Sequence, residues 1–162
     1  MSTWWPVDVA LYQPSIPQNT GNIGRLCVGM KQRLHLIGPC GFDLSEKAVR
    51  RAGLDYWQHL DWRLHEGPDA FLAWLGDRAP WLVTRHGQTR FDRVPWGRDD
   101  VLVFGNEASG LPSAWRARWP ERTVRIPVLG PIRAFNLANA VAMIVSHANL
   151  RMGVFDDEEW SP

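Results

Sequence analysis

Short apolar segments alternate with amphipathic segments along the 162-residue chain, and this order limits the possible folds more than any other feature. Residues 81–84 and 101–104 form apolar runs, which are typical of parallel strands buried on both faces. Residues 137–150 instead repeat apolar side chains at helical spacing. Strands that alternate with helices build a mostly parallel sheet with helices on both faces. We therefore predict a single α/β domain.

The remaining elements follow from the same periodicities and from turn residues. Asn19 or Thr20 is suited to begin the first helix, after Pro14 and Pro17 end the first strand, and Asn136 is suited to begin the last helix. The expected strands are 7–12, 34–37, 56–60, 81–84, 101–104 and 123–126. The expected helices are 19–30, 45–51, 68–75, 112–119 and 137–150.

Composition favours a cytoplasmic protein without a membrane segment. The chain has 18 Lys and Arg against 17 Asp and Glu, so its bulk charge does not predict nucleic-acid binding. Four of the acids lie at 156–159, and we expect a domain at 1–155 followed by an acidic tail at 156–162. Two cysteines are too few for a secreted disulfide scaffold. No apolar stretch approaches the roughly 20 residues of a membrane helix, and the N-terminus lacks a signal-peptide pattern.

Several common chemistries have no motif in this sequence. There is no G-x-G-x-x-G after the first strand, no G-x-x-x-x-G-K-[ST], no H-E-x-x-H or C-x-x-C, and no G-x-S-x-G. The five histidines are scattered. A dinucleotide site, a P-loop, a metal site and a hydrolase triad are therefore disfavoured.

Three loops at expected strand ends carry polar and glycine-rich motifs. N-T-G-N-I-G-R at 19–25 offers glycines and free helix N–H groups to an anion, with Arg25 about one and a half turns into the helix. F-G-N-E-A-S-G-L-P at 104–112 places two glycines around a carboxylate, which suits a ligand against bare backbone. Residues 126–140 form an apolar loop that leads into a helix carrying Asn136 and Asn139 on one face. Each loop alone is also consistent with a purely structural role, as a capped turn, a glycine-rich turn or a surface polar residue, and for residues 19–25 alone this role is favoured.

Together with R-R-A-G-L-D-Y at 50–56, the three motifs resemble one family in order and spacing. The chain resembles the SPOUT class of knotted methyltransferases, specifically the small tRNA ribose 2′-O-methyltransferases that modify the wobble nucleotide, over roughly residues 8–152. The resemblance implies an α/β domain with a deep trefoil knot near the C-terminus. Knots are nearly absent from other proteins, so periodicity alone does not predict one.

The resemblance also implies a cofactor and the residues that bind it. The methyl donor is S-adenosylmethionine, which becomes S-adenosylhomocysteine, and no metal takes part. The donor is held in the knot mainly by backbone groups of three loops. On this sequence the implied cofactor-binding residues are Val83, Thr84, Gly105, Asn106, Gly110, Ile126, Val128, Ala134 and Leu137.

The implied reaction is attack by a ribose 2′-hydroxyl on the donor methyl group, in the shared site of a homodimer. Arg25 would position the RNA phosphate and the 2′-oxygen and take the proton, while Asn19 and Asn136 orient the site. Glu107 would hold an arginine or the ligand loop. The implied substrate-binding residues are Arg25, Arg133 and Asn139.

Two positions depart from the family pattern and keep other functions open. Family members commonly have serine where this chain has Ala134 and Ala138. A missing hydroxyl removes a hydrogen bond worth on the order of 0.5–1.5 kcal/mol. The main expectation is methylation of the wobble cytidine or uridine of tRNA. The alternatives are methylation at another tRNA or rRNA site, a non-catalytic RNA- or adenosine-binding module, and a plain nucleotide-binding α/β protein.

Overall fold

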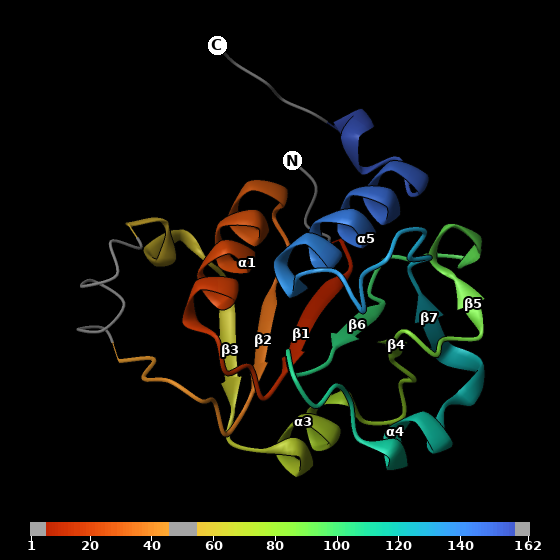
Figure 1. Cartoon of the computed structure of the whole chain (residues 1–162). Helices are drawn as coiled ribbons and strands as arrows, with labels where there is room; N and C mark the ends of the chain where they lie inside the picture. Colours follow the sequence, from red (N-terminus) through yellow and green to blue (C-terminus); the bar gives the residue numbers. More distant parts are fainter. Residues whose placement is uncertain (1–5, 46–54, 158–162) are drawn as a thin grey trace.

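The computed structural model describes residues 6–45 and 55–157 and shows one parallel sheet between two helical layers (Figure 1). The seven strands found in these ranges pair in the order β3-β2-β1-β6-β4-β7-β5, and every pairing is parallel. This confirms the predicted fold class. The strands are β1 (Asp8–Tyr12), β2 (Leu34–Ile37), β3 (Trp62–His65), β4 (Trp81–Val83), β5 (Thr89–Arg90), β6 (Val101–Phe104) and β7 (Thr123–Arg125).

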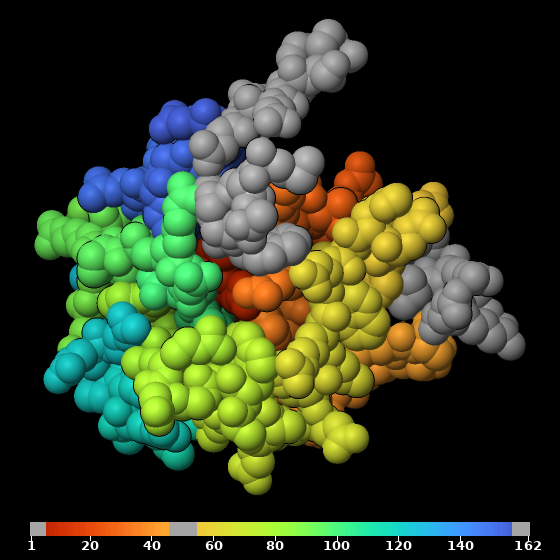
Figure 2. All heavy atoms as spheres, turned by 180° about the vertical axis from the view of Figure 1, so that it is seen from behind, coloured from red at the N-terminus to blue at the C-terminus, as the bar shows by residue number. Residues whose placement is uncertain are grey.

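The helices lie on both faces of the sheet. The α-helices are α1 (Pro17–Met30), α3 (Pro68–Leu75), α4 (Ser113–Arg118) and α5 (Leu137–Arg151). Shorter 3₁₀ turns are η1 (Asp55–His59), η2 (Phe91–Arg93), η3 (Pro120–Arg122) and η4 (Val154–Asp157). Helices α1 and α5 lie side by side on one face, and Figure 2 shows α3 and α4 as neighbours on the other. No described helix is long and apolar enough to cross a membrane.

Alternation along β1 explains the two layers. Val9 and Leu11 point toward α1 and α5, whereas Ala10 points toward α3 and α4. All three side chains are completely buried. Strands β2 and β6 are also buried along their whole length, as their apolar runs predict. The centre of the sheet therefore has no solvent-exposed face, and ligands are restricted to its ends.

A buried polar network lies on the α3 side of the sheet. The Asp8 carboxylate lies 2.9 Å from Nε2 of His35, and Nδ1 of His35 lies 3.0 Å from Nε2 of His65. The Arg33 guanidinium contacts the same carboxylate at 3.3 Å. Burial, together with nearby His35 and Arg63, lowers the pKa of His65 to about 4. His65 is therefore neutral at pH 7, and one of its ring nitrogens is hydrogen-bonded to His35.

One predicted strand is wrong. Residues 56–60 were expected at a sheet edge, but 55–59 form the 3₁₀ turn η1, and the edge strand is β3 at 62–65. The physical reason is a contact with α1. A Cβ on Gly24 would lie 2.7 Å from the Trp57 ring, so glycine lets that aromatic ring lie directly on the helix. Burial of Trp57 and Leu60 in the core outweighs the preference of this segment for extended structure.

The predicted start of α1 is also wrong. The helix begins at Pro17, with Ile16 as the N-cap and no side-chain cap, rather than at Asn19 or Thr20. Proline is favoured in a first helical turn because it lacks the N–H that would have no partner there. Pro17 therefore starts the helix instead of ending the strand. By contrast, Asn136 does cap α5, because its side chain accepts the N–H of Asn139 at 3.2 Å.

Some expectations fall outside the described residues. The helix predicted at 45–51 has only its first residue within the described ranges, and most of the 50–56 motif lies between them. The acidic tail at 156–162 is described only as far as residue 157.

The segment between β4 and β5 crosses directly over the end of β7. The Thr84 N–H donates to the Val124 carbonyl at 2.9 Å, and the Arg125 guanidinium donates to the Gly87 carbonyl at 3.0 Å. A Cβ built on Gly87 would lie 2.3 Å from the carbonyl carbon of Val124, closer than any real contact. Glycine at 87 is thus required by the crossing of two backbones. Residues 84–88 therefore lie directly against the point where the chain leaves β7.

We expect Gly87→Ala to lower the free energy of unfolding by about 2–3 kcal/mol, because the added methyl group forces two backbones apart. Urea denaturation measures this change. Gly130→Ala is the matched control, since nothing lies within 4 Å of a Cβ there, and it should change stability by less than about 0.5 kcal/mol. Equal effects of the two substitutions would contradict the crossing.

Candidate active site

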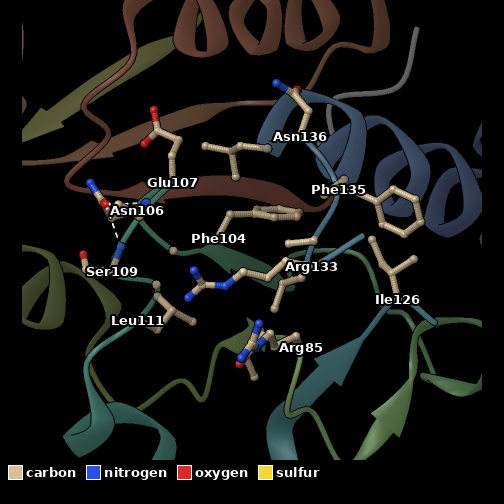
Figure 3. A pocket seen from close by; sticks show the side chains of 18 of the residues that line it. Arg85, Phe104, Asn106, Glu107, Ser109, Leu111, Ile126, Arg133, Phe135 and Asn136 are labelled. Atoms are coloured by element: carbon tan, nitrogen blue, oxygen red, sulfur yellow. Dashed lines mark hydrogen bonds between the residues drawn. The ribbon is translucent and has the colours of Figure 1, made fainter. Parts of the chain in front are cut away.

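A cavity of about 660 Å³ opens where β4, β6 and β7 end, as expected for a parallel sheet (Figure 3). Its walls come from the first turn of α1, residues 83–86, residues 104–111, residues 126–137 and α4. The apolar lining side chains are Ile16, Val83, Phe104, Leu111, Ile126, Val128, Phe135 and Leu137. The size is in the usual range for pockets that hold a small molecule, roughly 300–1,000 Å³.

The loop after β6 is fixed by its own backbone. The N–H groups of Asn106 and Gly110 each donate to the other residue's carbonyl, at 3.1 and 3.0 Å. Gly110 has a φ of +70°, a conformation that favours glycine. A Cβ on Gly105 would lie 2.5 Å from the carbonyl carbon of Gly110. The two glycines flanking Glu107 therefore let the loop fold back on itself and present backbone at the cavity wall.

Asn106 anchors this loop to the end of β1. Its amide group donates to the Gln13 carbonyl at 2.7 Å, and its oxygen accepts the N–H groups of Ala108 and Ser109 at 2.8 and 3.0 Å. The last two bonds form an Asx-type turn, in which an asparagine side chain replaces a backbone acceptor. Asn106 thus positions the loop, although its own side chain is occupied.

A chain of hydrogen bonds joins the three loops through Asn19, which is only 6% exposed. The Glu107 carboxylate accepts the N–H groups of Ser15 and Ile16 at 3.1 and 2.7 Å and the Asn19 amide at 3.5 Å. The Asn19 oxygen accepts the Asn136 amide at 3.0 Å. A carboxylate that accepts backbone N–H groups forms stronger hydrogen bonds than a neutral acceptor. Glu107 therefore fixes the start of α1, and Asn19 ties it to the cap of α5.

The segment before α5 leaves backbone groups free. Within residues 127–135, the one backbone–backbone hydrogen bond found in the described part of the chain runs from the Ile132 N–H to the Gly130 carbonyl. Val128, Ala134 and Phe135 of this segment also line the cavity. Such a surface can hold a flat heterocycle, which needs apolar contact on its faces and polar partners at its edges.

Positive charge gathers on the same cavity. Arg85, Arg116 and Arg133 all line it, and Figure 3 shows the side chains of Arg85 and Arg133 within it. Glu107 is the one carboxylate among the described lining residues. None of the three guanidiniums is paired with an acid in the described structure. The cavity therefore combines an apolar interior with an unpaired cationic rim.

Most predicted site residues lie together in this cavity. The implied cofactor residues Val83, Thr84, Gly105, Asn106, Gly110, Ile126, Val128, Ala134 and Leu137 all line it. So do Asn19, Glu107, Arg133 and Asn136. Asn139 does not line it. Sequence reasoning missed Arg85, His86 and Arg116, although Arg85 and His86 directly follow a predicted strand end, which was a usable signal.

Arg25 lies elsewhere, exposed on the outer side of α1. It lines a second hollow of about 430 Å³ with Val28, Gly29, Asp55 and Tyr56. The Tyr56 hydroxyl donates to the Gly21 carbonyl in the same helix. Burial raises the pKa of Tyr56, while the positive charge of Arg25 opposes that rise. Within one chain, the predicted catalytic arginine therefore does not face the cavity.

The described residues contain no group of three or more His, Cys, Asp or Glu side chains that could hold a metal ion. The candidate site is thus built from backbone groups, amides, guanidiniums and apolar side chains. It lies at the carboxyl ends of the strands of a doubly covered parallel sheet, which is where α/β proteins bind their ligands.

The chain belongs to the SpoU rRNA Methylase family, whose model matches residues 6–146. A tRNA (cytidine(34)-2′-O)-methyltransferase from Methylovorus glucosotrophus is 42% identical over 142 residues, or 87% of this chain and 92% of that protein. A putative RNA methyltransferase from Bacillus anthracis superposes with a TM-score of 0.89 at 34% identity, over 96% of this chain and 99% of that chain. The methyltransferase AviRb from Streptomyces viridochromogenes, in complex with AdoMet, superposes with a TM-score of 0.76 at 25% identity. The match covers 95% of this chain and 60% of the AviRb chain. The chain is therefore a SPOUT-type methyltransferase.

We expect Asn19→Ala to weaken S-adenosylmethionine binding by about tenfold, because it breaks the bridge between the loops and removes the acceptor of the Asn136 amide. Isothermal titration calorimetry measures the affinity. Asn22→Ala provides a control on the same helix, where the side chain is exposed, and should bind normally. Normal binding by Asn19→Ala would show that the bridge does not shape the cavity.

Proposed function

We propose that this enzyme transfers a methyl group from S-adenosylmethionine to the ribose 2′-hydroxyl of the wobble cytidine or uridine of tRNA. The observation that carries the proposal is the convergence of three loops, from different parts of the sequence, on one cavity. The relative from Methylovorus supports the tRNA substrate by its name, and the AviRb complex supports the cofactor.

The residues present suit S-adenosylmethionine. The unpaired backbone of 127–135 and the side chains of Ile126 and Val128 fit an adenine base. The close approach of Gly105 to Gly110 exposes bare backbone to the rest of the ligand. When bound, this cofactor supplies an electrophilic methyl group on a cationic sulfur, so no metal is needed. Its product is S-adenosylhomocysteine.

The protein then has to position the nucleophile and accept its proton. We assign the positioning of the RNA phosphate and the 2′-oxygen to Arg25, with Arg133 and Asn139 as further RNA contacts. A guanidinium is almost always protonated, so Arg25 can take the hydroxyl proton only when the phosphate organises it. The hydrogen bond between the Asn19 and Asn136 amides holds the starts of α1 and α5 in place beside the cavity. Glu107 acts indirectly, because its carboxylate is occupied by the start of α1.

A homodimer explains why Arg25 lies outside its own chain's cavity. We propose that Arg25 reaches the cavity of a partner subunit. Exposed apolar side chains on α5 and η4 support an interface on this side of the molecule: Met143, Leu150 and Phe155 are 38%, 67% and 41% exposed. In an isolated subunit such side chains would face water, whereas a second copy would cover them.

We further propose that residues 1–155 form one knotted domain with an acidic tail, which acts in the cytoplasm. The close crossing of residues 84–88 over the end of β7 supports the knot. The crossing is the geometry that a knot requires, because α5 then returns to pack beside α1 on the opposite half of the sheet.

A ribosomal RNA substrate is the second candidate, since the family description names rRNA. The names of the similar curated proteins favour tRNA. A non-catalytic binding module is the third candidate, because Ala134 and Ala138 replace the usual serines. Methyl transfer to isolated tRNA and rRNA separates all three.

The test uses purified protein, labelled S-adenosylmethionine, and RNA from cells that lack the enzyme. We expect transfer to tRNA and not to rRNA, at the ribose of the wobble nucleotide, as mapped by mass spectrometry. Arg25→Ala should lower the transfer rate about 100-fold or more without weakening cofactor binding. Unchanged transfer by Arg25→Ala would remove its catalytic assignment.

Subunit mixing tests the shared site. A Gly110→Val variant should lose cofactor binding, because valine is strained at a φ of +70°. Mixed with Arg25→Ala, it should regain part of the wild-type activity, since a mixed dimer holds one cavity with an intact Arg25 opposite it. Absence of recovery, although mixed dimers form, would place Arg25 in its own chain's site.

A further inference from the structure

We propose that Arg85 and Arg116 form a second RNA contact, which binds backbone phosphates on the side of the cavity formed by β4 and α4. This inference rests on the proposed function, and it names residues that the methyl-transfer chemistry does not itself require. Both arginines line the cavity that would hold the cofactor.

The two arginines approach from separate elements. Arg85 directly follows Val83 and Thr84 at the end of β4, and Arg116 lies in α4, downstream of the loop that ends β6. The Arg85 Nε donates to Nε2 of His86 at 3.4 Å, which leaves both terminal amino groups of the guanidinium free. Two free amino groups in one plane match the two oxygens of a phosphate.

The charge of the cofactor is too small to neutralise all of the guanidiniums at this cavity. S-adenosylmethionine carries one carboxylate together with a cationic sulfur and an ammonium group. It therefore brings one anionic group to the three guanidiniums of Arg85, Arg116 and Arg133, together with two positive charges of its own. Glu107, the single acidic lining residue in the described ranges, already accepts two backbone N–H groups. The positive charge of the three guanidiniums thus remains largely unbalanced after the cofactor binds.

An RNA strand supplies the missing anions. Like charges around one cavity repel one another, and an anion that enters the cavity relieves this repulsion. The target ribose must reach the cofactor's methyl group inside this cavity, so its flanking phosphates arrive at the rim. Arg85 and Arg116 line the same rim, but they have no role in the RNA contacts assigned above or in the hydrogen bonds of Asn19. We therefore place phosphates of the target strand against them.

The test measures RNA and cofactor binding separately. The probe is a fluorescent tRNA anticodon stem-loop, titrated by anisotropy at several KCl concentrations, and S-adenosylmethionine binding is measured by calorimetry. Arg85→Ala and Arg116→Ala should each weaken stem-loop binding about five- to tenfold at moderate salt. Each should also reduce the slope of log K against log[KCl] by about 0.7–0.9, the value of one phosphate contact. Cofactor affinity should stay within twofold.

Arg118→Ala is the matched control. It removes the same charge from the same helix, two residues away, but Arg118 does not line the cavity, and its guanidinium stacks on Trp119 at 4.4 Å. Its salt slope should be that of the wild type. Arg116→Lys should keep the wild-type slope, because the charge is retained.

Two results would overturn the inference while leaving the proposed function intact. Salt slopes for Arg85→Ala and Arg116→Ala equal to that of Arg118→Ala would show that neither arginine contacts phosphate. Weaker cofactor binding with unchanged stem-loop binding would assign them to the cofactor carboxylate. Failure of the wild-type enzyme to bind the stem-loop and to methylate tRNA would instead overturn the proposed function itself.

Discussion

The buried amide of Asn19 connects the parts of this molecule that have to stay together. Parallel strands bring the ends of β4, β6 and β7 to one edge of the sheet, but the loops that follow them could still adopt many arrangements. Asn19 contacts Glu107 on one side and Asn136 on the other, so the starts of α1 and α5 are held against the loop after β6. The cavity has its shape because these polar contacts are satisfied inside it.

The interior and the rim of the cavity suit two different ligands, the cofactor and the RNA. Its interior uses apolar side chains and free backbone, which suits a neutral heterocycle, while its rim carries guanidiniums without acidic partners. A cationic cofactor has little need of such a rim, whereas an RNA strand does. This division explains how a chain with a net charge of only +1 can act on nucleic acid: the charge is local, at the place where the phosphates arrive.

Sequence predicted the parts of the fold that depend on local pattern. Residues 34–37, 68–75 and 101–104 are elements at the expected bounds, and Asn136 caps α5 as proposed. Predictions failed where tertiary contact decides. Asn19 is not a helix cap, because its side chain bonds to the neighbouring loops instead. The segment around Trp57 is a 3₁₀ turn rather than a strand, because the absence of a side chain at Gly24 lets the Trp57 ring pack on α1. The insertion of β7 between β4 and β5 depends on a backbone crossing, which no local signal encodes.

The most direct measurement is a crystal structure of the enzyme with S-adenosylhomocysteine. We expect adenine between the 126–128 segment and the loop at 105–110, with base edges bonded to backbone groups and the sulfur open to the rim of Arg85, Arg116 and Arg133. Density for the ligand outside this cavity, or a cavity that stays empty at saturating ligand, would contradict it.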